Sequence, residues 1–423
     1  MSGARPLRIA AFSAVDLSLP GGHALHLRGL LDALASRGHD IVLVTPAPSG
    51  SAPPTRFARL TVPLLQWRVL GHWSFELLGG VRLLARALLA RPHLIYARQD
   101  LYTRAPAVVA RLLRLPLVLE VNASIVDSLP AETRRSVRRM VAASEQRMAR
   151  AASAIVVLDE RLGERLAERT GIPRERLRTV PIATHLPSAL ILAAGPATRR
   201  EEGIAAGTFV VGFAGNLSPM QGSDRLLEAV ASFPAVGADP PVVCWIVGDG
   251  AGAAALRRRA RALGLDGRRV RFFGGLLREE TDRLLAACHV LVAPYHVDSW
   301  ERASRGGPIS SKILTYLASD RPVVVTPLSP YAWIEERGFG SLAASDESAD
   351  LARAIAAWAV RWRDDGAPEV DWPWPSPGPA RRWIEAERTW DHAAADVEDV
   401  LRGIAGPAAP SGRAATSSAP RPR

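Results

Sequence analysis

The sequence predicts an α/β protein of two doubly wound, Rossmann-like domains that face each other across a cleft. Short apolar, β-branched runs alternate with longer segments of helical period, and this alternation restarts near the middle of the chain. The length of 423 residues also allows two domains, at roughly 100–200 residues per domain. In such folds, ligands bind beyond the carboxyl ends of the strands.

The first half contains five runs typical of buried parallel strands, at 7–13, 40–46, 93–98, 116–122 and 154–158. Segments of helical period lie between them at 24–37, 75–89, 103–113 and 131–151. The connection around 187–203 is rich in small residues and marks a boundary. We therefore predict an N-terminal domain over 1–188.

The second half repeats the pattern, with strands expected at 209–214, 242–247, 270–273, 290–294 and 322–326. Helices are expected at 224–232, 253–263, 279–287 and 311–319. These elements predict a C-terminal domain over 189–380. A tryptophan- and proline-rich stretch then favours a packed crossover, with a helix over 381–404, and the Ala/Pro/Ser/Arg segment 405–423 is expected to be disordered.

Composition excludes several classes of protein. An apolar fraction of 48% with 22% charged residues excludes a disordered or collagenous chain, and two cysteines cannot form a disulfide framework. Nearly uncharged apolar stretches such as 186–197 are shorter than the ~20 residues that cross a bilayer. We expect a cytoplasmic protein in a reducing compartment.

The formal net charge of +11 belongs to the first half, where residues 1–188 hold 26 arginines against 14 acidic residues. Arginines recur at helical spacing between 134 and 150, and others flank a leucine-rich segment at 82–91. Such a surface suits anionic lipid, so we expect peripheral contact with the inner face of the membrane; a solvated helix face is the equal alternative. No aromatic-interleaved basic motif indicates nucleic acid.

Two adjacent glycines, Gly21 and Gly22, follow the first predicted strand and precede a helix. Backbone N–H groups can approach a ligand closely there, and a helix N-terminus favours an anion, although such glycines are more often only turn makers. With His26 four residues after Gly22 and the run RGHD at 37–40, the segment resembles the N-terminal signature of family 4 glycosyltransferases. These are retaining nucleotide-sugar enzymes of GT-B fold.

The second half is similar to the same family at VGFAGNL (211–217), WIVGDG (245–250), RFFG (271–274) and SSKILTYLASDRPVV (310–324). The resemblance implies a nucleotide-sugar donor on the C-terminal domain and an acceptor on the N-terminal domain, with no cofactor and no metal. The donor-binding positions that it implies are Gly21, Gly22, Gly215, Asn216, Gly248, Gly274, Ser310, Ser311, Lys312 and Thr315.

Lys312 is the only lysine in the chain and lies at the start of a predicted helix in the donor motif. A compact ammonium group can approach a diphosphate where a planar guanidinium does not fit. The helix N-terminus and the hydroxyls of Ser310 and Ser311 would assist it. We therefore interpret Lys312 as a catalytic, diphosphate-binding residue, against the alternative of a solvent lysine left by chance.

The chain departs from the family where two acidic residues are usual, because those positions hold Gly307 and Thr315. Thr315 could offer one hydroxyl to the ribose, and Asp298 or Glu301 could replace the first carboxylate. The usual basic pair falls on Asn216 and Gln221, which leaves charge neutralisation to Lys312 and to an arginine such as Arg302 or Arg305. Loss of these groups supports an alternative function, a catalytically degenerate GT-B binding or scaffolding subunit; a GT-B sugar epimerase is a weaker third hypothesis.

Arg98, Glu120 and Asn122 end two predicted strands of the first half and should face the cleft. By resemblance they lie near the acceptor and the sugar, together with His26. A carboxylate inside the apolar run 115–121 is costly to bury unless paired, which makes Glu120 a catalytic candidate or, equally, one half of a salt bridge to Arg98. His and Asp residues are scattered without metal-ligand spacing.

The sequence therefore predicts a glycosyltransferase that moves a sugar from a nucleotide-diphosphate donor to a glycan or lipid-linked acceptor. By resemblance, the anomeric configuration is retained and the leaving diphosphate helps to deprotonate the acceptor. The basic N-terminal half favours a lipid-linked or otherwise anionic saccharide, as in polysaccharide biosynthesis.

Overall fold

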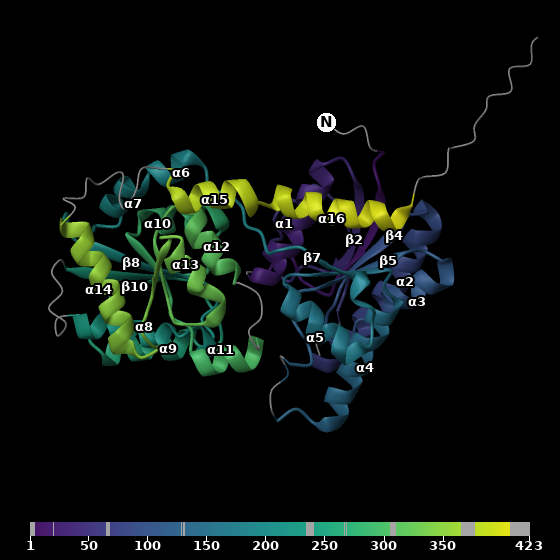
Figure 1. Cartoon of the computed structure of the whole chain (residues 1–423), viewed down its shortest axis with the longest axis horizontal. Coiled ribbons are helices and arrows are strands. Elements are labelled where there is room, and N and C mark those ends of the chain that lie inside the picture. Colours follow the sequence, from purple (N-terminus) through teal and green to yellow (C-terminus); the bar gives the residue numbers. More distant parts are fainter. Residues whose placement is uncertain are drawn as a thin grey trace, which may run out of the picture.

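Two parallel β-sheets, each flanked by helices on both faces, form the protein in a computed structural model (Figure 1). The structure describes residues 5–19, 21–64, 68–127, 129, 132–233, 241–265, 267, 269–304, 310–364 and 377–406. The first sheet and its helices come from the N-terminal half and the second from the C-terminal half. The predicted pair of doubly wound domains is confirmed.

The first sheet has seven strands within the described residues, in the order β3-β2-β1-β4-β5-β6-β7, and all neighbours are parallel. Its inner strands β4 and β5 are buried along their whole length because helices cover both faces. The strands are β1 (Arg8–Phe12), β2 (Asp40–Pro46), β3 (Ala58–Val62), β4 (Leu94–Arg98), β5 (Leu117–Val121), β6 (Ala154–Val157) and β7 (Leu177–Thr179).

One face of this sheet packs against four helices, and α1 covers the other face. The helices are α1 (Gly22–Ser36), α2 (Arg68–Ala90), α3 (Ala105–Leu113), α4 (Arg135–Ala151) and α5 (Glu160–Thr170), followed by a short turn of 3-10 helix at Arg174–Arg176. Strand order reverses between β1 and β4, which places the loop after β1 at a topological switch point.

The second sheet has the order β10-β9-β8-β11-β12-β13 within the described residues, and it too is parallel. Its switch point lies between β8 and β11. The strands are β8 (Phe209–Ala214), β9 (Val242–Val247), β10 (Val270–Gly274), β11 (Val290–Ala293), β12 (Val323–Val325) and β13 (Gly340–Leu342).

Helices α8 (Ser223–Ser232), α9 (Ala253–Ala262) and α14 (Ser348–Asp364) cover one face of the second sheet. The other face packs against α10 (Arg278–Ala287), α12 (Ser311–Ala318), α13 (Ala332–Glu336) and α15 (Pro379–Glu387). The remaining helices are α6 (Ala189–Ala193), α7 (Gly195–Glu201), α11 (Val297–Ser304) and α16 (Trp390–Ala405), with 3-10 turns at Pro219–Gln221 and Ser329–Tyr331. No helix among these residues is long and apolar enough to cross a membrane.

The chain crosses between the domains twice, and the two crossings lie side by side. The backbone N–H of Thr184 donates to the Arg388 carbonyl at 2.8 Å, and Thr184 forms a β-bridge with Thr389. Because this pairing interrupts the helical ladder, the helix expected over 381–404 is instead two helices, α15 and α16. The first packs on α12 and the second on α1. Of the expected tail over 405–423, Ala405 ends α16 and residues 407–423 lie outside the described residues.

Helix α16 extends back over the first domain and packs along α1, as Figure 1 shows. The contact requires a glycine, because a Cβ atom on Gly29 would overlap the indole ring of Trp390. The same ring makes an edge-on contact with His26, at a centroid separation of 5.3 Å. The return of the chain thus fixes α1 and the histidine on it.

We expect Gly29→Ala to lower the free energy of unfolding by about 1–3 kcal/mol, because the added methyl group overpacks the α1–α16 contact. Urea unfolding of the full chain measures it. Gly403→Ala is the matched control: Gly403 lies on α16 with open space around it, so there alanine should stabilise by up to about 1 kcal/mol. Equal effects at the two positions would contradict the packing argument.

Candidate functional site

Two helix N-termini, one from each domain, meet beside the domain crossings. A Cβ atom on Gly22, the first residue of α1, would lie 3.4 Å from Oγ of Ser311, the first residue of α12. Neither helix has an acidic residue in its first turn. Two positive helix ends therefore lie together with no carboxylate in the first turn of either helix, an arrangement that favours an anion. Gly21, Gly22, Ser310 and Ser311, predicted from opposite halves of the chain, are thus neighbours.

Lys312 lies in the first turn of α12, with its side chain buried among aromatic rings. Its Nζ is 4.1 Å from the ring centroid of Phe213 and 4.9 Å from that of Tyr295. Its hydrogen-bond acceptor is neutral, the Oε1 of Gln221 at 2.7 Å. Gly215, with φ of +154°, leaves room for the chain, since a Cβ there would lie 2.9 Å from Lys312 Cε.

Burial without a carboxylate lowers the pKa of Lys312 to about 7. The ring faces and the Gln221 oxygen compensate only part of the desolvation. The ammonium group is therefore close to half protonated at neutral pH, and a bound anion would shift it towards the charged form. The alternative interpretation of Lys312 as a solvent lysine is wrong, because only 9% of the residue is exposed.

Glycines at the carboxyl ends of β8, β9 and β10 form a backbone ladder. The Gly215 N–H donates to the Val247 carbonyl at 3.0 Å, and the Gly248 N–H donates to the Gly274 carbonyl at 2.7 Å. A side chain on Gly248 would collide with the Gly215 carbonyl, so the strands can come this close only with glycine there. Three predicted donor-binding positions thus form one surface, next to the exposed Asn216.

Thr315, on α12 one turn after Lys312, lies where the resemblance expects a ribose-binding carboxylate. Its Oγ1 is 3.4 Å from Oγ1 of Thr184, in the first domain crossing. Two hydroxyl groups therefore lie together at this position. Of the other substitutes considered from sequence, Asp298 is exposed in the first turn of α11. Gly307 and Arg305, and the side chains of Glu301 and Arg302, lie outside what the structure describes.

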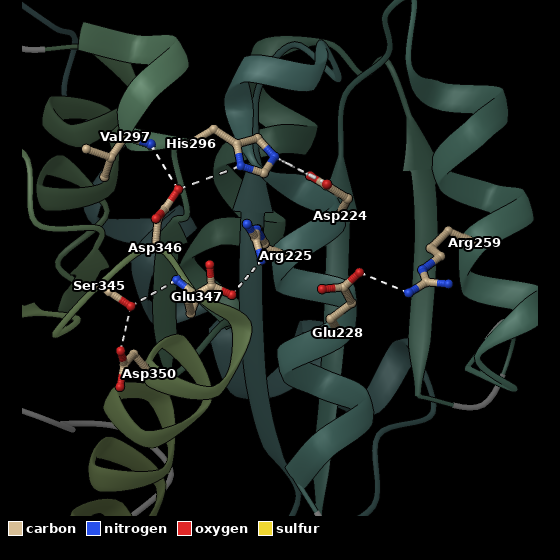
Figure 2. A network of polar contacts seen from close by, with 10 residues as sticks. All are labelled: Asp224, Arg225, Glu228, Arg259, His296, Val297, Ser345, Asp346, Glu347 and Asp350. Carbon is tan, nitrogen blue, oxygen red and sulfur yellow. Dashed lines mark hydrogen bonds and ion pairs between the residues drawn. The ribbon is translucent and has the colours of Figure 1, made fainter.

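A network of polar contacts holds the loop after β11 (Figure 2). His296 contacts Asp224 of α8 at 3.0 Å and Asp346, before α14, at 3.8 Å. Asp346 also accepts from the backbone N–H of Val297, at 3.1 Å. The network therefore ties the loop after β11 to α8 and to the segment that precedes α14.

In the first domain, Glu120 at the end of β5 is 1% exposed and fully paired. Its Oε1 lies 2.6 Å from His26 Nε2 and accepts from Asn122 Nδ2 at 2.6 Å, while its Oε2 accepts from the Tyr96 hydroxyl at 2.6 Å. Desolvation by burial raises the pKa of Glu120, but the charge interaction and hydrogen bond with His26, the Arg98 charge and the Tyr96 hydroxyl outweigh it and lower the pKa to about 2. The geometry gives this carboxylate a positioning role towards His26 and Asn122.

The salt bridge between Arg98 and Glu120, the alternative drawn from sequence, is wrong: the ion-pair partner of Glu120 is His26. Arg98 instead donates to the His23 carbonyl at 3.2 Å and lies 2.6 Å from His23 Nδ1. Desolvation, and then the Arg98 charge, lower the pKa of His23. With Nδ1 accepting from Arg98, the neutral imidazole keeps its proton on Nε2, beside the Gly22 turn.

The residues that surround the predicted site residues were not identified from the sequence. Phe213 is the penultimate residue of one predicted strand and Tyr295 directly follows another, so their position at the carboxyl edge of the second sheet could have been inferred. Trp390 and Thr184 gave no signal, because their roles come from contacts between segments far apart in the chain. Within the described residues, no group of three or more His, Cys, Asp or Glu side chains is placed to hold a metal.

Two family models match the chain: "Glycosyl transferase 4-like domain" over residues 21–183 and "Glycosyl transferases group 1" over 208–359. They cover the two sheet domains in turn and together about three quarters of the chain. The chain belongs to the family 4-like glycosyltransferases of GT-B fold. The predicted resemblance to this family is thereby confirmed.

Solved structures show the fold of this glycosyltransferase at low sequence identity. Anabaena HepE in complex with UDP-glucose matches at 18% identity with a TM-score of 0.67, over 93% of this chain and 99% of that one. WaaG, described as a glycosyltransferase involved in lipopolysaccharide biosynthesis, matches at 16% identity with a TM-score of 0.67, over 94% of this chain and 100% of that one. Sucrose-phosphate synthase from Thermosynechococcus elongatus matches at 19% identity with a TM-score of 0.69, over 94% of this chain and 99% of that one. A comparison with curated protein sequences finds no significant match.

We expect Glu120→Gln to destabilise the glycosyltransferase more at about pH 5 than at about pH 3. A folded-state pKa below the unfolded value contributes stability that is present above about pH 4.5 and lost as the pH falls towards 2. For this shift, the difference in free energy of unfolding between wild type and variant should shrink by about 2 kcal/mol from about pH 5 to about pH 3, as measured by urea unfolding. Glu164→Gln, at an exposed carboxylate near Arg174, is the control and should show no such change. A pH-independent gap would refute the assigned pairing.

Proposed function

We propose that this glycosyltransferase moves a sugar from a nucleotide-diphosphate donor to an acceptor held by its N-terminal domain, with retention of configuration. The observation that carries the proposal is the meeting of the α1 and α12 N-termini beside Lys312. Backbone N–H groups, serine hydroxyls and one ammonium group there suit a diphosphate. The binding of UDP-glucose by HepE, a neighbour in fold, makes UDP and UDP-sugars the first donors to test.

In the proposed reaction, the bond between the sugar anomeric carbon and the diphosphate oxygen breaks as the acceptor oxygen attacks from the same face. The acceptor proton passes to the leaving diphosphate. Lys312 and the two helix ends stabilise the negative charge that grows on this leaving group. Such preorganised groups are commonly worth about 10²–10³ in rate each. The residues named here need no metal for this step, so we propose metal-independent transfer without a cofactor.

The acceptor would lie against the carboxyl ends of β4 and β5. His23, fixed by Arg98, and Asn122, fixed by Glu120, are the polar groups available there. The excess of arginine in residues 1–188 supports a lipid-linked or otherwise anionic saccharide acceptor. Buried, unpaired Cys244 and Cys288 suit a reducing compartment, which supports a cytoplasmic location.

The catalytically degenerate alternative rests on the missing carboxylates, since Thr315 and Thr184 offer hydroxyls only. Hydroxyl groups can still hold ribose hydroxyls, and Lys312 keeps a position that costs stability. A buried cation without an anionic partner destabilises the folded chain, which favours a ligand role over a structural one.

We expect UDP to bind wild-type protein at about pH 8 with uptake of a proton, because Lys312 is then largely neutral in the free protein. Calorimetry in buffers of different ionisation enthalpy measures this uptake. Lys312→Met should abolish the uptake and weaken binding by about thirtyfold or more. Arg258→Met, on the exposed face of α9, is the control and should change neither.

The same variant also tests the assigned burial of Lys312. Because the folded-state pKa lies below the unfolded value, wild-type stability rises with pH between about 7 and 10.5. Lys312→Met should therefore be the more stable protein below about pH 7, and its advantage should fade towards pH 10. A less stable variant at neutral pH would show that the lysine has a structural role.

We expect purified protein to release nucleoside diphosphate from one member of a nucleotide-sugar panel when membrane lipid extract is supplied as acceptor. The anomeric configuration of the product, read by NMR, should match that of the donor. Nucleotide binding without turnover on any donor would establish the degenerate binding subunit. If no nucleotide binds, both proposals fail.

A further inference from the structure

Exposed apolar side chains gather on two neighbouring helices of the first domain. Of thirteen exposed large hydrophobic residues among those the structure describes, eight lie on α2 and α3. We call this surface the α2–α3 face; its members are Trp73, Leu77, Leu78, Val81, Leu88, Leu89, Val108 and Leu112. The two helices pack against each other, so the residues form one surface rather than scattered sites.

Helix α2 is apolar on two sides. Phe75, Leu83 and Ala87 are buried against the sheet, as an ordinary amphipathic helix requires. Trp73, Leu77 and Val81, spaced four residues apart, form a second stripe that faces outward. Figure 1 places α2 and α3 on the side of the first domain away from the second domain, which therefore leaves this stripe uncovered.

The α2–α3 face is also purely basic. Residues 68–114 include two acidic side chains, and both point inward. Glu76 accepts from the backbone N–H groups of Arg104 and Ala105 at 2.8 Å, and Asp100 accepts from the Ala14 N–H at 2.9 Å. The exposed charged residues of α2, α3 and their C-caps are Arg82, Arg91, Arg111 and Arg114, which have no acidic partner within the described residues.

One end of the face lies beside the acceptor side of the site. The Trp73 ring stacks on Tyr102 at a centroid separation of 5.5 Å. Tyr102 follows the carboxyl end of β4, where Arg98 holds His23. The rest of α2 leads away from that edge. A molecule anchored in a plane along α2 would thus have its polar end close to His23.

We propose that the α2–α3 face docks on an anionic lipid bilayer, with its leucines, valines and tryptophan in the interfacial layer and its arginines at the phosphates. Apolar residues beside arginines without acidic neighbours match such a surface, since both the hydrophobic and the electrostatic contribution favour it. The exposed arginines at 134–150, on and near α4, have no exposed large apolar residue beside them on that helix. They would therefore add electrostatic attraction to the bilayer, but no side chain there would insert into it. The proposal rests on the proposed function only for its purpose, access to a lipid-linked acceptor.

The experiment is flotation of the full-length protein with vesicles of phosphatidylcholine, with and without phosphatidylglycerol. We expect binding to the anionic vesicles that weakens with salt. Leu89→Glu should reduce the partition coefficient by about tenfold or more. Leu190→Glu is its matched control, because Leu89 and Leu190 are both 84% exposed and Leu190 lies on α6. Arg82→Ala should reduce it by about fivefold, and more than Arg135→Ala on α4.

Three results would overturn the proposal: no preference for anionic vesicles, equal loss in Leu89→Glu and Leu190→Glu, or a wild-type dimer that Leu89→Glu dissociates. The last would show that a second copy covers the face. UDP binding of each variant without vesicles separates the two proposals. Vesicle binding without nucleotide binding refutes the proposed function alone, and nucleotide binding without vesicle binding refutes the docking surface alone.

Discussion

The packing of Trp390 into the space above Gly29 is the contact on which the site depends. It anchors α16, and hence the returning chain, to α1. The Thr184–Arg388 hydrogen bond holds the two domain crossings together, and the Arg381 guanidinium donates to the Pro187 and Ala318 carbonyls at 2.9 and 3.0 Å. With both crossings fixed, the Gly22 turn is placed against Ser311. The same tryptophan contacts His26, so the domain connection also orders the part of the site that the first domain contributes.

The two sides of the site handle buried charge differently. Glu120 is fully satisfied by His26, Asn122 and a tyrosine hydroxyl, and its burial therefore stabilises the arrangement around it. Lys312 has ring faces and a neutral amide instead of an anion, and its burial costs stability. A satisfied carboxylate suits a group that positions others, whereas an unsatisfied ammonium suits a group that awaits a ligand. This contrast is the physical reason for proposing that the diphosphate binds beside Lys312.

Helix α2 links the site to the outer surface. Its inner stripe completes the core under β1 and β2, and its Glu76 caps α3 through two backbone N–H groups. Because Glu76 points inward to cap α3, the outward side of α2 carries only apolar and basic exposed side chains among the described residues. A free-standing soluble domain gains nothing from that stripe, since each exposed leucine forgoes about 1.5–3 kcal/mol of burial energy.

The sequence by itself determined the two βα arrays and their inner strands, because local periodicity encodes buried elements. It missed β3, β7 and β13, which are edge strands with few or no buried residues and so carry no continuous apolar run. Only the tertiary structure decided that Glu120 pairs with His26 rather than Arg98, that Phe213 and Tyr295 enclose Lys312, and that Thr184 faces Thr315. Those partners lie far apart in the chain, and geometry in space, which sequence spacing does not encode, selects among them.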